Sequence, residues 1–167
     1  KGFSYSESPD ADSGLSKRIF GTFLTWLQER KKMVFVVATS NDILALPPEF
    51  LKKGRFDEIF FIDLPDDRER REIITIHLAK REKRPEDFGI DLLVRKTEGF
   101  SGAEIEQLIV SALYSAFSGS GNLTTELILE EVDNTRPLSI TMSEKIEALR
   151  ECAKERTVPA SSSHRPT

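Results

Sequence analysis

The stretch MVFVVATSNDILALPPEFLKKGRFDEIFFIDLP, residues 33–65, decides the fold of this chain. It contains two apolar runs, Met33–Ala38 and Ile59–Leu64, in which Val, Ile and Phe do not alternate with polar residues. A short continuous apolar run bounded by turn residues is typical of a strand that is covered on both faces, as in a parallel sheet. Polar residues follow each run, and ligands of open parallel sheets lie beyond the carboxyl ends of the strands. The stretch therefore predicts a parallel sheet with polar groups at its functional edge.

The composition of the whole chain excludes several classes of protein. The net charge of −4 over 167 residues gives no general attraction to nucleic acid or to anionic membranes. Cys152 is the only cysteine, so the sequence offers no internal disulfide framework and no cysteine metal cluster. No apolar run approaches the roughly 20 residues of a membrane helix, and the polar opening, residues 1–14, is unlike a signal peptide. A reducing cytoplasm is the default expectation.

Apolar residues at three- and four-residue spacing predict that most of the remaining chain is helical. The expected helices cover residues 15–30, 43–51, 66–83, 91–97, 101–116, 123–132 and 141–153. Ser101 and Glu104 form an S-x-x-E capping box, and residues 141–144 repeat the pattern before the last helix.

For two of these helices, the sequence allows more than one environment for a helix face. The aromatic residues of helix 15–30, Trp26 among them, are expected to pack in the core, with a partner-facing patch as the alternative. The charged residues of helix 66–83 are expected to form a solvated face with i,i+4 pairs. That face comprises Arg68, Glu69, Arg70, Arg71, Glu72 and Lys80.

Several separated motifs occur in an order that resembles a known family. A strand ends in ATSN, LPPEFL and GRFD follow, and a second strand ends in DLP. Further along, GFSGAEIEQLI covers residues 99–109 and RPLSITMSEKIEALRECAKER covers residues 136–156. This order resembles the AAA ATPases, in particular their bacterial and plastid-encoded ycf-type members. The resemblance extends over nearly the whole chain.

The resemblance implies an α/β fold followed by helices. Residues 1–64 would be the C-terminal part of a doubly wound P-loop AAA+ nucleotide-binding domain, with an incomplete parallel sheet and an exposed strand edge. Residues 65–157 would form an all-helical lid subdomain. The polar residues 158–167 are expected to be a disordered tail.

The sequence contains no phosphate loop of the form G-x-x-x-x-G-K-[ST]. In the family, KGF directly follows the acidic Walker B strand end, so the carboxylates that bind Mg²⁺ would lie before Lys1. We therefore expect the chain to be the C-terminal part of a longer ATPase, with a short natural protein as the alternative. By itself it is expected not to hydrolyse ATP.

Two residues are expected to act at the phosphates. Asn41 alone would favour a turn cap, but in the family this position is sensor 1, whose neutral amide holds the attacking water near the γ-phosphate. Arg55 alone would belong to a solvated basic turn. In the family it is an arginine finger that reaches the γ-phosphate of the adjacent subunit. Many relatives have a second Arg where this chain has Lys52, which supplies charge but no fork of donors.

Four residues of the expected lid match nucleotide contacts of the family. Ile73 and His77 lie four residues apart and so share a helix face, although a single His taken alone is more often a packed or surface imidazole. The resemblance makes both part of the adenine and ribose pocket. Gly102 and Ala103 would contact the base, because their small side chains allow a close approach. No metal ligand is expected within the chain.

The resemblance also implies cofactors and partners. The protein would bind ATP and Mg²⁺, and the Mg²⁺ ligands would lie largely outside this chain. Its subunits would form a homo-oligomeric ring, expected to be a hexamer, that remodels a protein substrate. The protein would lie in the bacterial cytoplasm or the plastid stroma. His77 and His164 are the only histidines, so the chain carries no H-E-x-x-H protease motif, and no pattern indicates nucleic-acid binding. The alternative is a non-catalytic assembly or adaptor module built on helix 15–30 and the lid helices.

Overall fold

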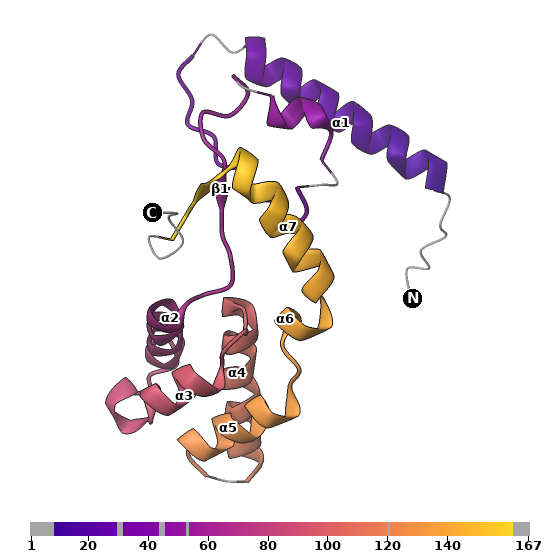
Figure 1. Cartoon of the computed structure of the whole chain (residues 1–167). Coiled ribbons are helices and arrows are strands. Elements are labelled where there is room, and N and C mark those ends of the chain that lie inside the picture. Colours follow the sequence, from indigo (N-terminus) through magenta and orange to yellow (C-terminus); the bar gives the residue numbers. More distant parts are fainter. Residues whose placement is uncertain (1–8, 30–31, 44–45, 53, 120, 162–167) are drawn as a thin grey trace. The chain divides into compact units, whose positions relative to one another are not determined.

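The computed structural model describes residues 9–29, 32–43, 46–52, 54–119 and 121–161 of the chain (Figure 1). The chain divides into two compact units, Lys1–Ile59 and Phe60–Thr167. The fold is the one expected, an α/β part with an incomplete parallel sheet and a helical lid, although the sheet among the described residues has two strands. The division falls directly before the first of these strands rather than after Leu64. Within the described ranges, no helix is long and apolar enough to cross a membrane.

The first unit is built on an aromatic contact between two helices, α1 (Pro9–Glu29) and the 3-10 helix η1 (Pro48–Leu51). Phe50 of η1 is buried, and its ring centre lies 5.2 Å from that of Phe20, edge-on, and 6.1 Å from that of Phe23, stacked. Such pairs contribute about 0.5–1.5 kcal/mol beyond the burial of their surface. The core role expected for the aromatic residues of α1 is confirmed for these two.

The remaining apolar residues of α1 are less covered than the sequence predicts. Trp26 stacks on Phe23 at 5.9 Å, yet it remains 45% exposed. Ile19 is 59% exposed. In the described structure α1 therefore keeps an open apolar face.

The strand expected at Met33–Ala38 is wrong, because these residues form no strand in the structure. Met33, Phe35 and Val37 are exposed. A strand of this composition is stable where neighbouring strands bond its edges and helices cover its faces. Among the described residues there is one sheet, and it does not include this segment. The sequence pattern therefore indicates neighbouring strands and covering helices that the described residues do not provide.

Of the helix expected at residues 43–51, residues 44 and 45 lie outside the described part of the chain, and the described remainder contains η1. Pro47, the residue before it, is extended, with φ −54° and ψ 135°. A residue that precedes a proline is pushed away from the helical region, and Pro47 precedes Pro48. The two prolines therefore postpone the start of the helix.

Four helices of the second unit pack around one hydrophobic core. They are α2 (Asp67–Ala79), α3 (Ile90–Lys96), α4 (Gly102–Ser118) and α5 (Thr125–Asn134), with the 3-10 helix η2 (Pro85–Asp87) between α2 and α3. Their buried stripes include Ile74, Leu78, Leu93, Ile105, Leu108, Ile109, Ala112 and Ile128. Burying one large aliphatic side chain stabilises a fold by about 1.5–3 kcal/mol. Because helices this short are marginal alone, this shared core stabilises them.

Side-chain caps fix where the lid helices begin. The box predicted at the start of α4 is confirmed: the backbone N–H of Ser101 donates to Glu104 Oε2 at 2.8 Å, and that of Glu104 donates to Ser101 Oγ at 3.3 Å. Asp66 and Glu69 form a second box at the start of α2, with bonds of 3.0 and 2.8 Å. Each box satisfies two backbone donors that a helix start leaves unpaired.

The capping box expected at residues 141–144 is wrong. Thr141 is the last residue of a short helix, α6 (Leu138–Thr141), so it cannot cap the helix that follows. That helix, α7 (Ser143–Arg156), begins after Met142 without a side-chain capping bond.

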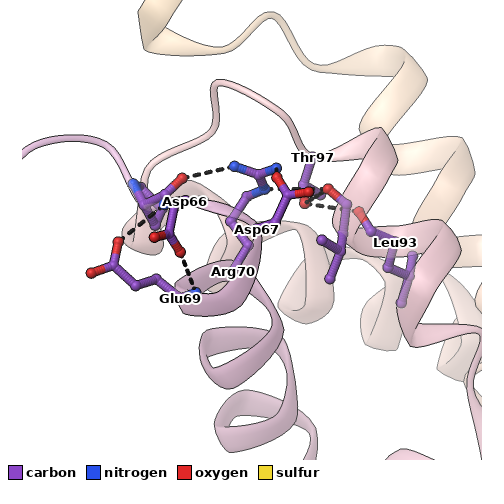
Figure 2. A network of polar contacts seen from close by, with 8 residues as sticks. Asp66, Asp67, Glu69, Arg70, Leu93 and Thr97 are labelled. Carbon is purple, nitrogen blue, oxygen red and sulfur yellow. Dashed lines mark hydrogen bonds and ion pairs between the residues drawn. The ribbon is translucent and has the colours of Figure 1, made fainter. Parts of the chain in front are cut away.

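The polar side of α2 is not uniformly solvated. Arg70, expected on a solvated face, is 4% exposed. Its guanidinium donates hydrogen bonds to Val94 O at 3.2 Å, Pro65 O at 2.7 Å and Asp67 Oδ1 at 2.5 Å. Figure 2 shows the side chain reaching from the first turn of α2 toward α3. The expectation was wrong for this residue, because a charge can be buried where its donors are bonded.

The C-terminal end of the second unit pairs with its N-terminal end through two short strands. Strand β1 (Phe60–Phe61) pairs in parallel with strand β2 (Val158–Pro159). Residues 158 and 159, which the sequence placed in a disordered tail, are therefore a strand. Residues 162–167 of that expected tail lie outside the described part of the chain.

A bidentate ion pair also links the two ends of the second unit. Arg150 of α7 binds Asp63, with 2.9 Å from Nε to Oδ2 and 2.9 Å from Nη2 to Oδ1. The hydrogen bond to Asp63 raises the pKa of the Arg150 guanidinium. Because a planar fork matches a carboxylate, the contact fixes the orientation of both side chains.

Candidate functional site

Two of the residues expected to contact a nucleotide meet between α2 and α4. Ile73 is half-buried and packs against the lid core. A Cβ built on Gly102, the first residue of α4, would lie 3.4 Å from Ile73 Cδ1. The two residues are therefore direct neighbours.

Ala103 extends this small-residue surface. It is exposed on the first turn of α4, next to Gly102. A flat aromatic ring can approach a backbone closely only where side chains are small. The start of α4 thus presents two small residues, Gly102 and Ala103, and the first of them lies beside Ile73.

His77 lies one turn further along α2 and belongs to a cluster of charged groups. Its Nδ1 lies 3.3 Å from Arg81 Nη1 and 3.2 Å from Glu106 Oε1, which comes from α4. Arg81 Nη2 donates to the same Glu106 oxygen at 3.0 Å. The His77 and Arg81 side chains are mostly buried, with 18% and 19% exposed. The imidazole is therefore fixed by groups from two helices.

The charge state of this cluster is set mainly by Arg81. Its hydrogen bond lowers the pKa of the Glu106 carboxyl group below its ordinary value, and the neighbouring His77 lowers it further. Glu106 is thus a carboxylate at neutral pH and acts only as an acceptor.

Sequence reasoning missed Arg81 and Glu106. The i,i+4 spacing of His77 and Arg81 was a usable signal for their contact within one helical face. The contact with Glu106 depends on how α2 is aligned on α4, which no local pattern specifies.

The two residues expected at the phosphates belong to the first unit. Asn41 is exposed in the loop after residues 33–38. Arg55 is half-buried, and its Nη1 donates to Leu24 O at 3.4 Å, a long and therefore weak bond. Lys52, at the end of η1, is exposed.

Groups of three or more His, Cys, Asp or Glu side chains that could hold a metal ion are absent from the described residues.

Two family models match the chain. The model described as "ATPase family associated with various cellular activities (AAA)" matches residues 5–64, which include Asn41 and Arg55. The model described as "AAA+ lid domain" matches residues 87–127, which include Gly102 and Ala103. Ile73 and His77 lie between the two matches.

Curated relatives are similar to most of the chain. The AAA domain-containing protein ycf46 of Guillardia theta is 49% identical over 143 residues, which are 85% of this chain and 28% of that protein. The ycf46 protein of Pyropia yezoensis is 50% identical over 139 residues, 83% of this chain and 28% of that protein. A proteasome-activating nucleotidase of Saccharolobus solfataricus is 41% identical over 101 residues, 60% of this chain and 25% of that protein. The chain thus spans a little more than a quarter of the length of the ycf46 relatives.

Proposed function

Because the chain belongs to the AAA family of ATPases, we propose that it is part of a subunit that binds and hydrolyses ATP to remodel protein substrates. The observation that supports this best is the contact between α2 and α4, where Gly102, which has no Cβ, lies beside the half-buried Ile73. Adenine is flat and apolar on its faces, so it requires a surface of this kind. In the proposal, Ile73, Gly102 and Ala103 bind the base and His77 contacts the base or the ribose.

The residues of the first unit would act on the phosphates. Asn41, whose neutral amide can both donate and accept, would orient the attacking water of its own subunit. Arg55 would reach the γ-phosphate of a neighbouring subunit and stabilise the negative charge of the transition state. The long bond from Arg55 to Leu24 costs little to break, so the guanidinium is available for this contact.

The remaining parts of the active site would come from outside this chain. ATP would supply the phosphoryl group, and Mg²⁺ held by residues before Lys1 would neutralise the phosphates. A contribution of Arg55 to a neighbour requires an adjacent subunit, and we propose that the subunits form a homo-oligomeric ring, a hexamer. Its place would be the bacterial cytoplasm or the plastid stroma, as for the expected ycf-type relatives.

The lid proposal predicts weak adenine binding by the 167-residue chain itself. Adding adenosine to the ¹⁵N-labelled chain is expected to shift the amide signals of Ile73, His77, Gly102 and Ala103, with a dissociation constant on the order of 1 mM. Gly102→Ala places a methyl group 3.4 Å from Ile73 Cδ1 and should weaken binding about fivefold or more. The measurement is a titration followed by amide chemical shifts.

Gly89→Ala is the matched control for Gly102→Ala. A Cβ at Gly89 would also meet a side chain at 3.4 Å, Thr125 Cγ2, but at the start of α3. This variant should bind adenosine like the wild type. Equal weakening in both variants, or shifts confined to residues outside the α2–α4 surface, would contradict the base site.

One observation favours the alternative of an adaptor module. Ile19 and Trp26 leave an apolar face of α1 exposed, as a partner-binding helix would. The adenosine titration separates the two proposals, since an adaptor gives no shifts at the four lid residues.

A further inference from the structure

Arg81 leaves the regular hydrogen-bonding pattern of α2 and turns back onto His77. Its backbone N–H donates to Leu78 O at 3.0 Å, and Glu82, which follows, has a positive φ of 58°. In a continued α-helix this N–H would donate to His77 O instead. Arg81 Nη1 bonds to that carbonyl at 3.0 Å. The side chain is thereby held along the end of its own helix.

The same guanidinium nitrogen also faces the His77 ring. Arg81 Nη1 lies 3.3 Å from His77 Nδ1. A guanidinium group can only donate hydrogen bonds, so this bond requires Nδ1 to accept and places the proton of the neutral imidazole on Nε2. Glu106 Oε1, 3.2 Å from the same nitrogen, is the competing acceptor and would favour the other tautomer. Glu106 Oε1 accepts from Arg81 Nη2 at 3.0 Å and so holds the guanidinium against the ring from α4.

The other ring nitrogen, Nε2, is open to solvent. No described residue forms a hydrogen bond with it, and the described structure contains no buried side-chain nitrogen or oxygen without a partner. His77 is mostly buried, with 18% of its side chain exposed. The exposed part of the ring therefore includes Nε2.

We infer that Arg81 and Glu106 are positioning residues for His77, which fix its ring so that Nε2–H is presented outward as a hydrogen-bond donor. The inference rests on the proposed function, in which this side of His77 meets an adenine nucleotide. A donor at this place selects an acceptor of the ligand, either a ring nitrogen of the base or an oxygen of the ribose. Glu106 holds the Arg81 guanidinium in place, and Arg81 donates a hydrogen bond to Nδ1 of His77.

The tautomer of His77 tests the inference without any ligand. In the ¹⁵N-labelled 167-residue chain at pH about 8.5, where an ordinary imidazole is neutral, the ring nitrogens of His77 should show a proton on Nε2. Arg81→Met removes the donor to Nδ1 while Glu106 remains as an acceptor beside it. The proton population should then move from Nε2 toward Nδ1, as read from the ¹⁵N shifts of the ring.

A second readout joins the tautomer to ligand binding. Arg81→Met should also weaken adenosine binding, about five- to tenfold for the loss of one well-placed hydrogen bond. Arg81→Lys keeps the charge and N–H donors but not the planar fork, so it should lie between the wild type and Arg81→Met. Arg84→Met is the control, because Arg84 pairs with Asp87 at 2.8 Å and does not contact His77.

The outcomes separate this inference from the proposed function. An unchanged tautomer in a folded Arg81→Met chain, as judged by its amide spectrum, overturns the positioning role. An altered tautomer with weaker adenosine binding supports it. An altered tautomer in a chain that shows no adenosine shifts, even as wild type, leaves the positioning of the ring standing and overturns the nucleotide site.

Discussion

Arg55→Ala, in an ATPase subunit that contains this chain, is expected to lower ATP turnover by ~10³–10⁵-fold with little change in ATP affinity. The guanidinium would act on charge that develops in the transition state of a neighbouring subunit, so its loss affects the chemical step more than ground-state binding. Folding should be preserved, because among the described residues the side chain of Arg55 forms one long hydrogen bond, to Leu24 O at 3.4 Å. The measurements are the turnover number at saturating ATP and the dissociation constant of ATP.

Three further variants sharpen this test. Arg55→Lys keeps a charge without the fork and should restore only a small part of the turnover. Arg68→Ala, which removes an exposed arginine paired with Glu72 at 3.6 Å, should have wild-type turnover. Lys52→Ala measures whether Lys52, at the position where many relatives have a second Arg, contributes to ATP turnover.

Complementation shows whether Arg55 acts across subunits. A subunit that cannot bind ATP but retains Arg55 should restore turnover when mixed with Arg55→Ala subunits. Absence of recovery in mixed rings, or a loss of ATP affinity as large as the loss of turnover, would rule out the finger assignment.

Arg70→Ala is expected to lower the free energy of unfolding of the second unit by about 3 kcal/mol, through loss of charged hydrogen bonds and of the desolvated partners they satisfy. The bond to Val94 O joins the start of α2 to α3, and the bond to Pro65 O holds the residue that precedes the N-cap of α2 (Figure 2). At the slopes usual for small domains, such a loss moves the urea midpoint by about 1–3 M. Urea unfolding followed by circular dichroism measures it.

Arg71→Ala provides the matched control on the next residue. Arg71 is half-exposed and pairs with Asp91, a partner at the surface. Exposed ion pairs contribute about 0–1 kcal/mol, so this variant should unfold close to the wild type. If both variants lost the same stability, burial of Arg70 would not be the cause. Arg70→Lys, which keeps the charge, should retain only part of the effect because a single ammonium cannot bond all three acceptors.

Local sequence patterns predicted the lid well and the remainder less well. The box of Ser101 and Glu104 is made within four residues, so the sequence alone was enough to identify it. The burial of Arg70 could not be identified in this way, since its partner Val94 lies 24 residues away on another helix. The strand at Met33–Ala38 failed for a related reason: apolarity indicates a covered position, but pairing depends on strands elsewhere in the chain or beyond it.

The candidate site divides in the same way. Helical spacing placed Ile73 and His77 on one face of a helix, and the resemblance to the family made Gly102 a contact of the base. The structure brings Gly102 next to Ile73. Whether either residue contacts a nucleotide stays a prediction. Arg81 and Glu106 were not found, because their meeting requires the alignment of α2 on α4. Whether Asn41 and Arg55 act at phosphates stays a prediction for the turnover measurements.

The ion pair of Arg150 with Asp63 has a consequence for the order in which the chain folds. Its partners are 87 residues apart, and closing a flexible loop of that length costs about 4 kcal/mol plus a constant. If α2 to α5 fold first, through contacts between neighbouring helices, most of that loop is already ordered and the closure becomes cheaper. During synthesis, the edge of β1 would therefore stay unpaired until β2 has been made. A chain that ends before Thr157 would fold helices α2 to α5 but leave β1 unpaired and prone to association.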